Sequence, residues 1–168
     1  YLKDVNTNLK KAKDKEQNVS LEIINGAVFV EGDIENSIAF KAAKKGCTEV
    51  LHGIFHGCSP EQKTGFFTQT NELGDTIAHL AAQWGSVDVL QCIFANCTEE
   101  QKQCLLTQYD NNGDTIAHFA AESGHVDFLQ CIFKNCDEGQ REALLTQVNK
   151  YGNTIAHLAA QWGSVDVL

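Results

Sequence analysis

The stretch TIAHLAAQWGSVDVL occupies residues 76–90 and returns, letter for letter, at residues 154–168. Around it the chain repeats with a period of 39 residues, marked by Gly74, Gly113 and Gly152. The units beginning at Gly74 and Gly113 are identical at 24 of 39 positions without a gap. A self-similar period of this length is typical of repeat proteins, in which each unit buries its apolar face only against its neighbours.

The first half of each unit predicts a pair of helices. Thr76 is suited to cap a first helix that Gly85 ends, and Ile77, Leu80 and Ala81 fall on one face of it. Adjacent alanines in this helix are small enough to let neighbouring helices approach closely. A second helix over 87–96 is predicted by an apolar stripe at helical spacing. The stripe consists of Val87, Leu90, Ile93, Phe94 and Cys97.

The second half of each unit predicts a short third helix. Ser59-Pro60-Glu61-Gln62 combines a capping serine, a proline at the first helical position and a glutamine at the third. The pattern returns at 98–101 and 137–140. We therefore expect third helices near 60–68, 99–107 and 138–146. Their expected buried pairs are Phe66-Phe67, Leu105-Leu106 and Leu144-Leu145.

Charge and hydropathy exclude two classes of partner. The net charge is −9, and residues 46–168 hold five basic residues against fifteen acidic ones, which argues against nucleic-acid binding. No apolar run approaches the length of a membrane span, so we expect no membrane insertion. The one basic cluster, Lys10–Lys15, is interleaved with acids. It is read as a solvated helix face in preference to a polyanion site.

Seven cysteines raise the question of metal or redox chemistry. Cys92 and Cys131 recur at one repeat position, and Cys58, Cys97 and Cys136 at another. Their spacing is not that of a zinc finger. We expect small apolar core residues in a reducing compartment, with metal binding or redox sensing as the alternative.

The string GDTIAHLAAQWGSVDVL at 74–90 resembles the ankyrin repeat, whose pattern reads G-x-T-P-L-H-x-A-A-x-x-G-x before an apolar helix. The resemblance covers residues 35–168 in units 35–73, 74–112, 113–151 and 152–168, the last truncated. It implies an all-α solenoid, here with an extra short helix per repeat. Because the last unit leaves a half-finished core face, we expect the natural protein to continue past Leu168.

Three departures from the family pattern matter. Isoleucine replaces the family's helix-starting proline in every unit, which weakens helix initiation. The period exceeds the usual 33 residues, so the projecting turn of the family is expected to be reshaped. The first unit has Phe40 where the others have His79, His118 and His157. The resemblance implies that this histidine hydrogen-bonds locally and to the next repeat, which is a structural role.

Residues 1–34 support two predictions. Leu21–Ile24 and Ala27–Val30 flank Asn25-Gly26, a hairpin signal that would belong to a preceding domain. The 39-residue register instead places Ser20 on Ser59 and Gly26 on Gly65. That register predicts a degenerate repeat acting as an N-terminal cap, which we favour.

No catalytic constellation stands out, and we expect neither catalysis nor a cofactor or metal within this segment. Asp75 and Asp114 recur once per unit and are expected to form a solvated row. The resemblance implies a protein partner bound on the concave face, through the turn before each repeat glycine and the residues after the paired alanines. Those positions are Glu72, Leu73, Asp75, Gln83, Trp84, Asn111, Asn112, Asp114, Glu122, Ser123, Lys150, Tyr151, Asn153, Gln161 and Trp162, with Ile34, Asn36, Lys44 and Lys45 in the first unit.

Trp84 and Trp162 are the strongest candidates for anchors, because tryptophan buries much area at little entropic cost. Packing against neighbouring turns is the alternative. The acidic turns predict a partner with a basic or amide-rich surface. We expect a monomeric, cytoplasmic interaction module.

The sequence pattern of the repeats, with T-I-A-H, the long unit and the segment E-Q-x-x-x-L-L-T-Q, also resembles that of ankyrin effectors. Intracellular bacteria such as Legionella deliver those effectors into the host cytosol. One alternative is a targeting or regulatory region of an enzyme whose catalytic domain lies outside this segment. Another is a structural spacer.

Overall fold

A computed structural model describes residues 38–162, which form ten α-helices in that part of the chain. The first helices of successive units begin 39 residues apart and are α3 (Ile38–Lys44), α6 (Ile77–Gln83), α9 (Ile116–Glu122) and α12 (Ile155–Gln161). The second helices are α4 (Thr48–Gly57), α7 (Val87–Ala95) and α10 (Val126–Lys134). The third helices are α5 (Pro60–Thr68), α8 (Glu99–Thr107) and α11 (Glu138–Thr146).

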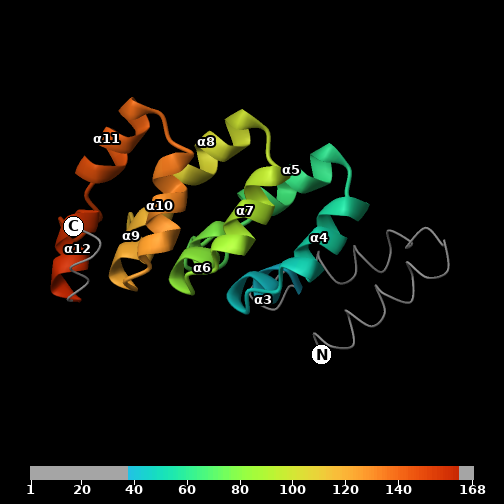
Figure 1. The fold of residues 1–168 in the computed structure, drawn as a ribbon, viewed down its shortest axis with the longest axis horizontal. Coiled ribbons are helices and arrows are strands. Elements are labelled where there is room, and N and C mark those ends of the chain that lie inside the picture. Colours follow the sequence, from blue (N-terminus) through green and yellow to red (C-terminus); the bar gives the residue numbers. More distant parts are fainter. Residues whose placement is uncertain (1–37, 163–168) are drawn as a thin grey trace.

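The helices stack in three rows (Figure 1). The first helices lie side by side along one edge, each packed on the next, and the second helices run beside them. The third helices line the opposite edge, where α5 contacts α8. The prediction of an all-α repeat solenoid with an extra short helix per unit is confirmed.

A threonine–histidine pair starts each of the later first helices in place of the family's proline. The Thr76 side chain accepts a hydrogen bond from the His79 backbone N–H, and the His79 ring accepts one from the Thr76 N–H. This reciprocal cap satisfies two backbone donors that a helix start leaves open. The helix therefore begins at Ile77 without a proline, and Gly85 ends the turn after it with φ +63°.

The core lies between the first and second helices. The paired alanines Ala81 and Ala82 are fully buried, which is what lets successive first helices pack closely. Two details of the predicted faces were wrong. Leu80 is only half-buried, whereas Val89 and Cys92, outside the expected stripe, are buried. The second helix is covered on two sides, by its own unit and by its neighbours, so its buried face is wider than one amphipathic stripe.

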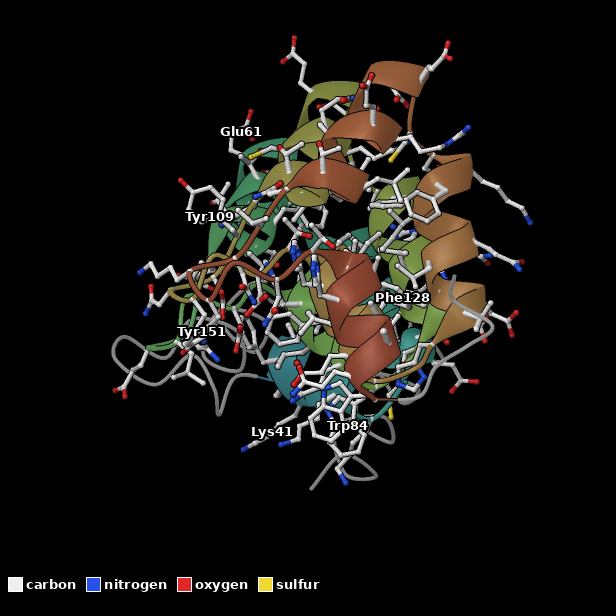
Figure 2. All side chains as sticks on the ribbon, turned by 90° about the vertical axis from the view of Figure 1, so that its left-hand side faces the viewer. Lys41, Glu61, Trp84, Tyr109, Phe128 and Tyr151 are labelled. Carbon is white, nitrogen blue, oxygen red and sulfur yellow. The ribbon has the colours of Figure 1, made fainter. Side chains whose placement is uncertain are left out.

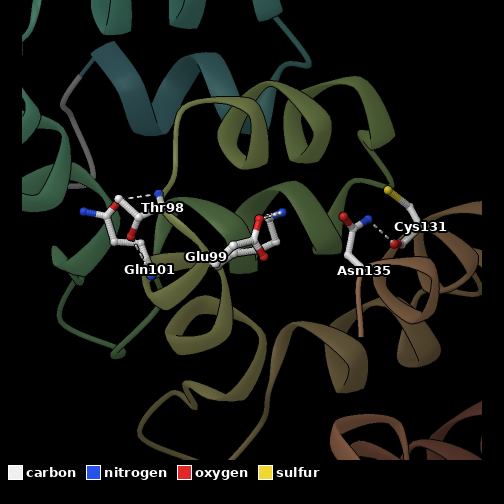
Figure 3. Close-up of polar contacts among 6 residues, drawn as sticks. Thr98, Glu99, Gln101, Cys131 and Asn135 are labelled. Carbon is white, nitrogen blue, oxygen red and sulfur yellow. Dashed lines mark hydrogen bonds and ion pairs between the residues drawn. The ribbon is translucent and has the colours of Figure 1, made fainter. Parts of the chain in front are cut away.

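The third helices have the predicted bounds because their start signal is local. Thr98 and Gln101 exchange side chain–backbone hydrogen bonds of 2.9 and 3.2 Å, as Figure 3 shows. Of the predicted buried pairs, one member is wrong: Leu145 is 47% exposed, while its equivalent Leu106 is fully buried. In residues 38–162 no second or third helix of a further unit lies beyond α11 to cover Leu145.

Several predictions fall outside the described residues. They concern the N-terminal cap or hairpin, the Lys10–Lys15 cluster, and Ile34 and Asn36 of the first unit. The turn between units, which we expected to be reshaped, is a compact loop after the third helix. In the middle unit it closes with a single antiparallel bridge between Tyr109 and Thr115.

Candidate functional site

The turns between units are held in shape by one side chain each. The Asn71 Oδ1 accepts hydrogen bonds from the backbone N–H groups of Leu73 (3.0 Å) and Asp75 (2.8 Å). Asp110 and Asn149 make the same pair of bonds in the next two turns. A carboxylate or amide that bonds backbone two and four residues ahead fixes a turn conformation. The predicted contact residues of the turns therefore stand on a defined backbone.

Adjacent turns are also joined to each other. The Asn111 N–H donates to the Leu73 carbonyl at 2.9 Å, and the Lys150 N–H donates to the Asn112 carbonyl at 2.8 Å. The Asn111 side-chain amide adds a bond of 2.9 Å to the Glu72 carbonyl. We call this series of backbone bonds the turn ladder. It makes the turns one continuous edge along the stack.

The repeated histidines link a first helix to the next unit. The ring Nδ1 of His79 accepts from the Thr76 N–H, so Nε2 carries the proton and donates to the Asp114 carbonyl at 3.2 Å. Burial lowers the pKa of His79 to about 4, so the ring is neutral near pH 7. His118 makes the equivalent contacts, with its pKa also lowered by burial. The predicted structural role is confirmed for His79 and His118, whereas His157 is exposed and makes the local cap bonds with Thr154.

The acidic residues of the turns are less exposed than expected. Asp75 is buried and accepts a 3.0 Å bond from the Asn71 side chain, and Asp114 is half-buried and accepts one of 2.8 Å from Asn149. The expectation of a solvated row is wrong, because these carboxylates are bonded within and between the turns. Burial raises the pKa of Asp114, an effect that the Asn149 amide partly opposes.

The C-terminal ends of the first helices form a second row. Trp84 is 53% exposed, and the Lys44 Nζ lies 5.7 Å from the centre of its ring. Trp162 is 61% exposed, and Glu122 and Ser123 lie between the two tryptophans in the repeat order. Burial, followed by the negative charge of Asp114, raises the pKa of Glu122. Trp84 thus packs partly against Lys44 and also keeps about half of its surface open.

We define the turn–helix face as the turns at 70–75, 109–114 and 148–153 together with the first-helix ends at 44–45, 83–84, 122–123 and 161–162. In Figure 2, Tyr109 and Tyr151 lie along one side of the stack, and Trp84 and Lys41 lie at its lower end. Two large exposed residues of the turns, Tyr109 and Val148, were absent from our predicted contact set. The sequence could have indicated them, because both occupy the same repeat position, directly before the residue that fixes the turn.

The predicted contact residues differ in accessibility. Asp75 is buried, and Asp114 and Asn153 are half-buried. The exposed ones are Glu72, Leu73, Gln83, Trp84, Asn111, Asn112, Glu122, Ser123, Lys150, Tyr151, Gln161 and Trp162, with Lys44 and Lys45 in the first unit.

Most of the cysteines behave as core residues, but Cys104 is exposed and Cys47 is half-buried. Cys92, Cys131 and Cys136 are buried, as predicted, and Cys58 and Cys97 are half-buried. Burial raises the pKa of Cys92 to about 11, so its thiol is protonated near neutral pH and is a poor nucleophile. Within residues 38–162, no group of three or more histidine, cysteine or acidic side chains is arranged to hold a metal ion. In the same part of the chain, no helix has the length and hydropathy needed to cross a membrane.

Comparison with known proteins gives a consistent result for the fold. A family model of ankyrin repeats, described as three copies, matches residues 39–142 and 103–168. No curated protein sequence matches the chain. Among solved structures, a chain in the crystal structure of the yeast ribosomal protein Rps3 in complex with its chaperone Yar1 superposes with a TM-score of 0.63. That match has 23% sequence identity and covers 77% of this chain and 85% of that one.

Proposed function

The chain belongs to the ankyrin-repeat family, and from that premise we propose that it is a protein-interaction module whose turn–helix face binds a partner protein. From α6 onward this face is built on short, capped helices and on turns that are bonded to one another. A surface that is already ordered loses little conformational entropy when it binds.

The observation that carries the proposal is where the large apolar side chains are exposed. Of the seven in residues 38–162, six lie on the turn–helix face. Four are in the turns, namely Leu73, Tyr109, Val148 and Tyr151, and two are the tryptophans at the first-helix ends. Clusters of exposed apolar residues mark interaction sites, and tryptophan and tyrosine are the residues most often found at binding hot spots. The face therefore has the composition of a binding surface.

The charge of the face supports a partner with a basic or amide-rich surface. The face holds five acidic residues against three lysines, so it is net acidic, although the lysines are all exposed and only two of the acids are. The acids are Glu72, Asp75, Asp110, Asp114 and Glu122, of which Glu72 and Glu122 are exposed, and the lysines are Lys44, Lys45 and Lys150. Exposed amides of Asn111 and Asn112 add hydrogen-bonding groups along the turns. Complementary charge steers the encounter of two proteins and excludes like-charged competitors.

The test is capture of proteins from a eukaryotic cell lysate with three baits, the wild-type protein and two variants. One bait carries Trp84→Ala, Tyr151→Ala and Trp162→Ala on the face. The control bait carries Leu145→Ala, an exposed apolar residue on a third helix outside the face. Circular dichroism checks that both remain helical. We expect a partner that the wild-type and control baits retain and the face variant loses. Equal retention by all three baits would contradict the proposal.

Two finer proposals concern the protein as a whole. The style of the repeats supports an effector of an intracellular bacterium that acts on a host protein in the cytosol. The alternative is that the array targets or regulates a catalytic domain elsewhere in the chain. Deleting the array from the full-length protein separates the two. Loss of partner binding without a change in any enzymatic activity supports the first, and altered activity of an attached domain supports the second.

A further inference from the structure

One contact on the turn–helix face already shows what its tryptophans can bind. The Lys44 Nζ of α3 lies 5.7 Å from the ring centre of Trp84, which ends α6 in the next unit. At this distance an ammonium group is attracted to the electron-rich face of the indole. The first-helix end of one unit thus places a cation over the tryptophan of the unit that follows it.

The repeat places a different pair in the same arrangement two units later. Counting two full repeats onward, Glu122 takes the position of Lys44 and Trp162 takes that of Trp84. The helices that carry them, α9 and α12, pack on each other as α3 packs on α6. The repeat register therefore places the shorter, negatively charged side chain of Glu122 relative to Trp162 as it places Lys44 relative to Trp84.

We propose that Glu122 and Trp162 together form a receptor for an arginine side chain of the partner protein. This inference rests on the proposed function and identifies the partner chemistry at one point of the same face. A planar guanidinium stacks on an aromatic ring and donates two parallel N–H groups to a carboxylate. The repeat register brings these two surfaces to neighbouring helix ends, and an arginine side chain can engage both at once.

The surroundings of Glu122 favour an incoming cation. No cation pairs with Glu122 in the part of the chain that the structure describes. The nearby charge is the carboxylate of Asp114, which repels a second negative charge. The 61% exposure of Trp162 leaves much of its surface open to a ligand. One repeat earlier, Gln83 takes the position of Glu122 and Ser123 takes that of Trp162, so that pair of units has neither component of the receptor.

The receptor can be tested with a defined probe, the capped peptide acetyl-Gly-Arg-Gly-amide. The protein contains two tryptophans, so its two indole N–H resonances report separately on Trp84 and Trp162 once a Trp84→Phe variant assigns them. We expect the peptide to shift the Trp162 resonance, with a dissociation constant of roughly 1–10 mM for so small a contact. The Trp84 resonance should move much less, because Lys44 already occupies that ring.

Three controls isolate the chemistry. A peptide with citrulline in place of arginine has the same shape without the charge and should leave Trp162 unshifted. Glu122→Gln keeps the size of the side chain and should weaken binding about tenfold, as expected for loss of a charged acceptor. Glu122→Lys should place an ammonium on Trp162, as Lys44 does on Trp84, and abolish the response to the peptide.

The outcomes separate this inference from the proposed function. No shift at Trp162, an equal shift of both tryptophans, or an equal response to citrulline would overturn the receptor. Suppose that the face variant loses a captured partner, that Glu122→Gln retains it, and that the peptide shifts no tryptophan resonance. The interaction module is then supported and the arginine receptor is refuted. If the peptide responds as expected but no bait captures a partner, the receptor stands and the proposed function loses its support.

Discussion

Lowering the pH from 7 to 5 should destabilise this array through His79, whose ring is buried between two units. Protonation adds a hydrogen to Nδ1, the atom that accepts from the Thr76 N–H at 3.1 Å, so the charged ring cannot keep the helix cap. Burial lowers the pKa of His79 to about 4 from its ordinary value of 6.5. At a pH between about 4 and 6.5, this histidine is therefore protonated in the unfolded chain and neutral in the folded chain.

The sign and size follow from this difference. Because the unfolded state binds more protons in that range, stability rises with pH. The contribution of a neutral His79 is fully present above about pH 6.5 and is lost as the pH falls towards 4. A gap of about 2.5 between the two pKa values corresponds to roughly 3 kcal/mol, of which about 2 kcal/mol is lost by pH 5. The lowered pKa of His118 also makes stability fall as the pH falls. The raised pKa values of Asp114 and Glu122 have the opposite effect, because the folded state then binds more protons than the unfolded state.

A matched variant, His79→Gln, isolates the histidine. Glutamine already performs this capping role at Gln101, whose side chain accepts from the Thr98 N–H at 2.9 Å, and it does not titrate. The variant loses the bond to the Asp114 carbonyl and should be about 1 kcal/mol less stable at pH 7. Urea unfolding followed by circular dichroism should show its stability falling about 2 kcal/mol less than wild type on going to pH 5. Equal slopes in the two proteins would refute the reasoning.

Two further predictions concern backbone and packing. Gly85→Ala should destabilise the protein more than Gly46→Ala in thermal unfolding, although both glycines have φ near +65°. The reason is that an added Cβ at Gly85 would lie 2.6 Å from the His125 ring, whereas at Gly46 the nearest atom would be 3.4 Å away. Equal losses of stability would mean that the His125 ring moves aside freely. Leu106→Ala should cost roughly 2–5 kcal/mol and Leu145→Ala less than about 0.5 kcal/mol in urea unfolding, since Leu106 is fully buried and Leu145 is 47% exposed. A large loss at Leu145 would show that this side chain is covered in solution.

The features that the sequence predicts well are those with a local physical cause. The third helix at Glu99–Thr107 matches its expected bounds, because the cap formed by Thr98 and Gln101 involves only neighbouring residues. The role of His79 also follows from the repeat, since one residue type at one position in successive units meets the same surroundings each time.

The features that the sequence predicts poorly depend on neighbouring units. Leu106 and Leu145 share a repeat position, yet only the first is covered. Asp75 looks like a surface residue by type, but the Asn71 amide bonds it inside the turn. The contact of Lys44 with Trp84 joins residues of two different units, and no periodicity within one unit indicates it. Burial and pairing of this kind become visible only when the units are stacked.

The turn ladder has a consequence for how such a protein acquires new specificities. Its linking bonds run between backbone groups, from Asn111 to Leu73 and from Lys150 to Asn112, so they do not depend on which side chains occupy those positions. Positions 73, 112 and 151 are equivalent in the repeat and already hold leucine, asparagine and tyrosine. After a unit is duplicated, its turn can therefore change identity by single substitutions while the joint to the neighbouring turn persists. The side chains at these positions can therefore vary, in evolution or in a designed library, while the backbone of the turns stays the same.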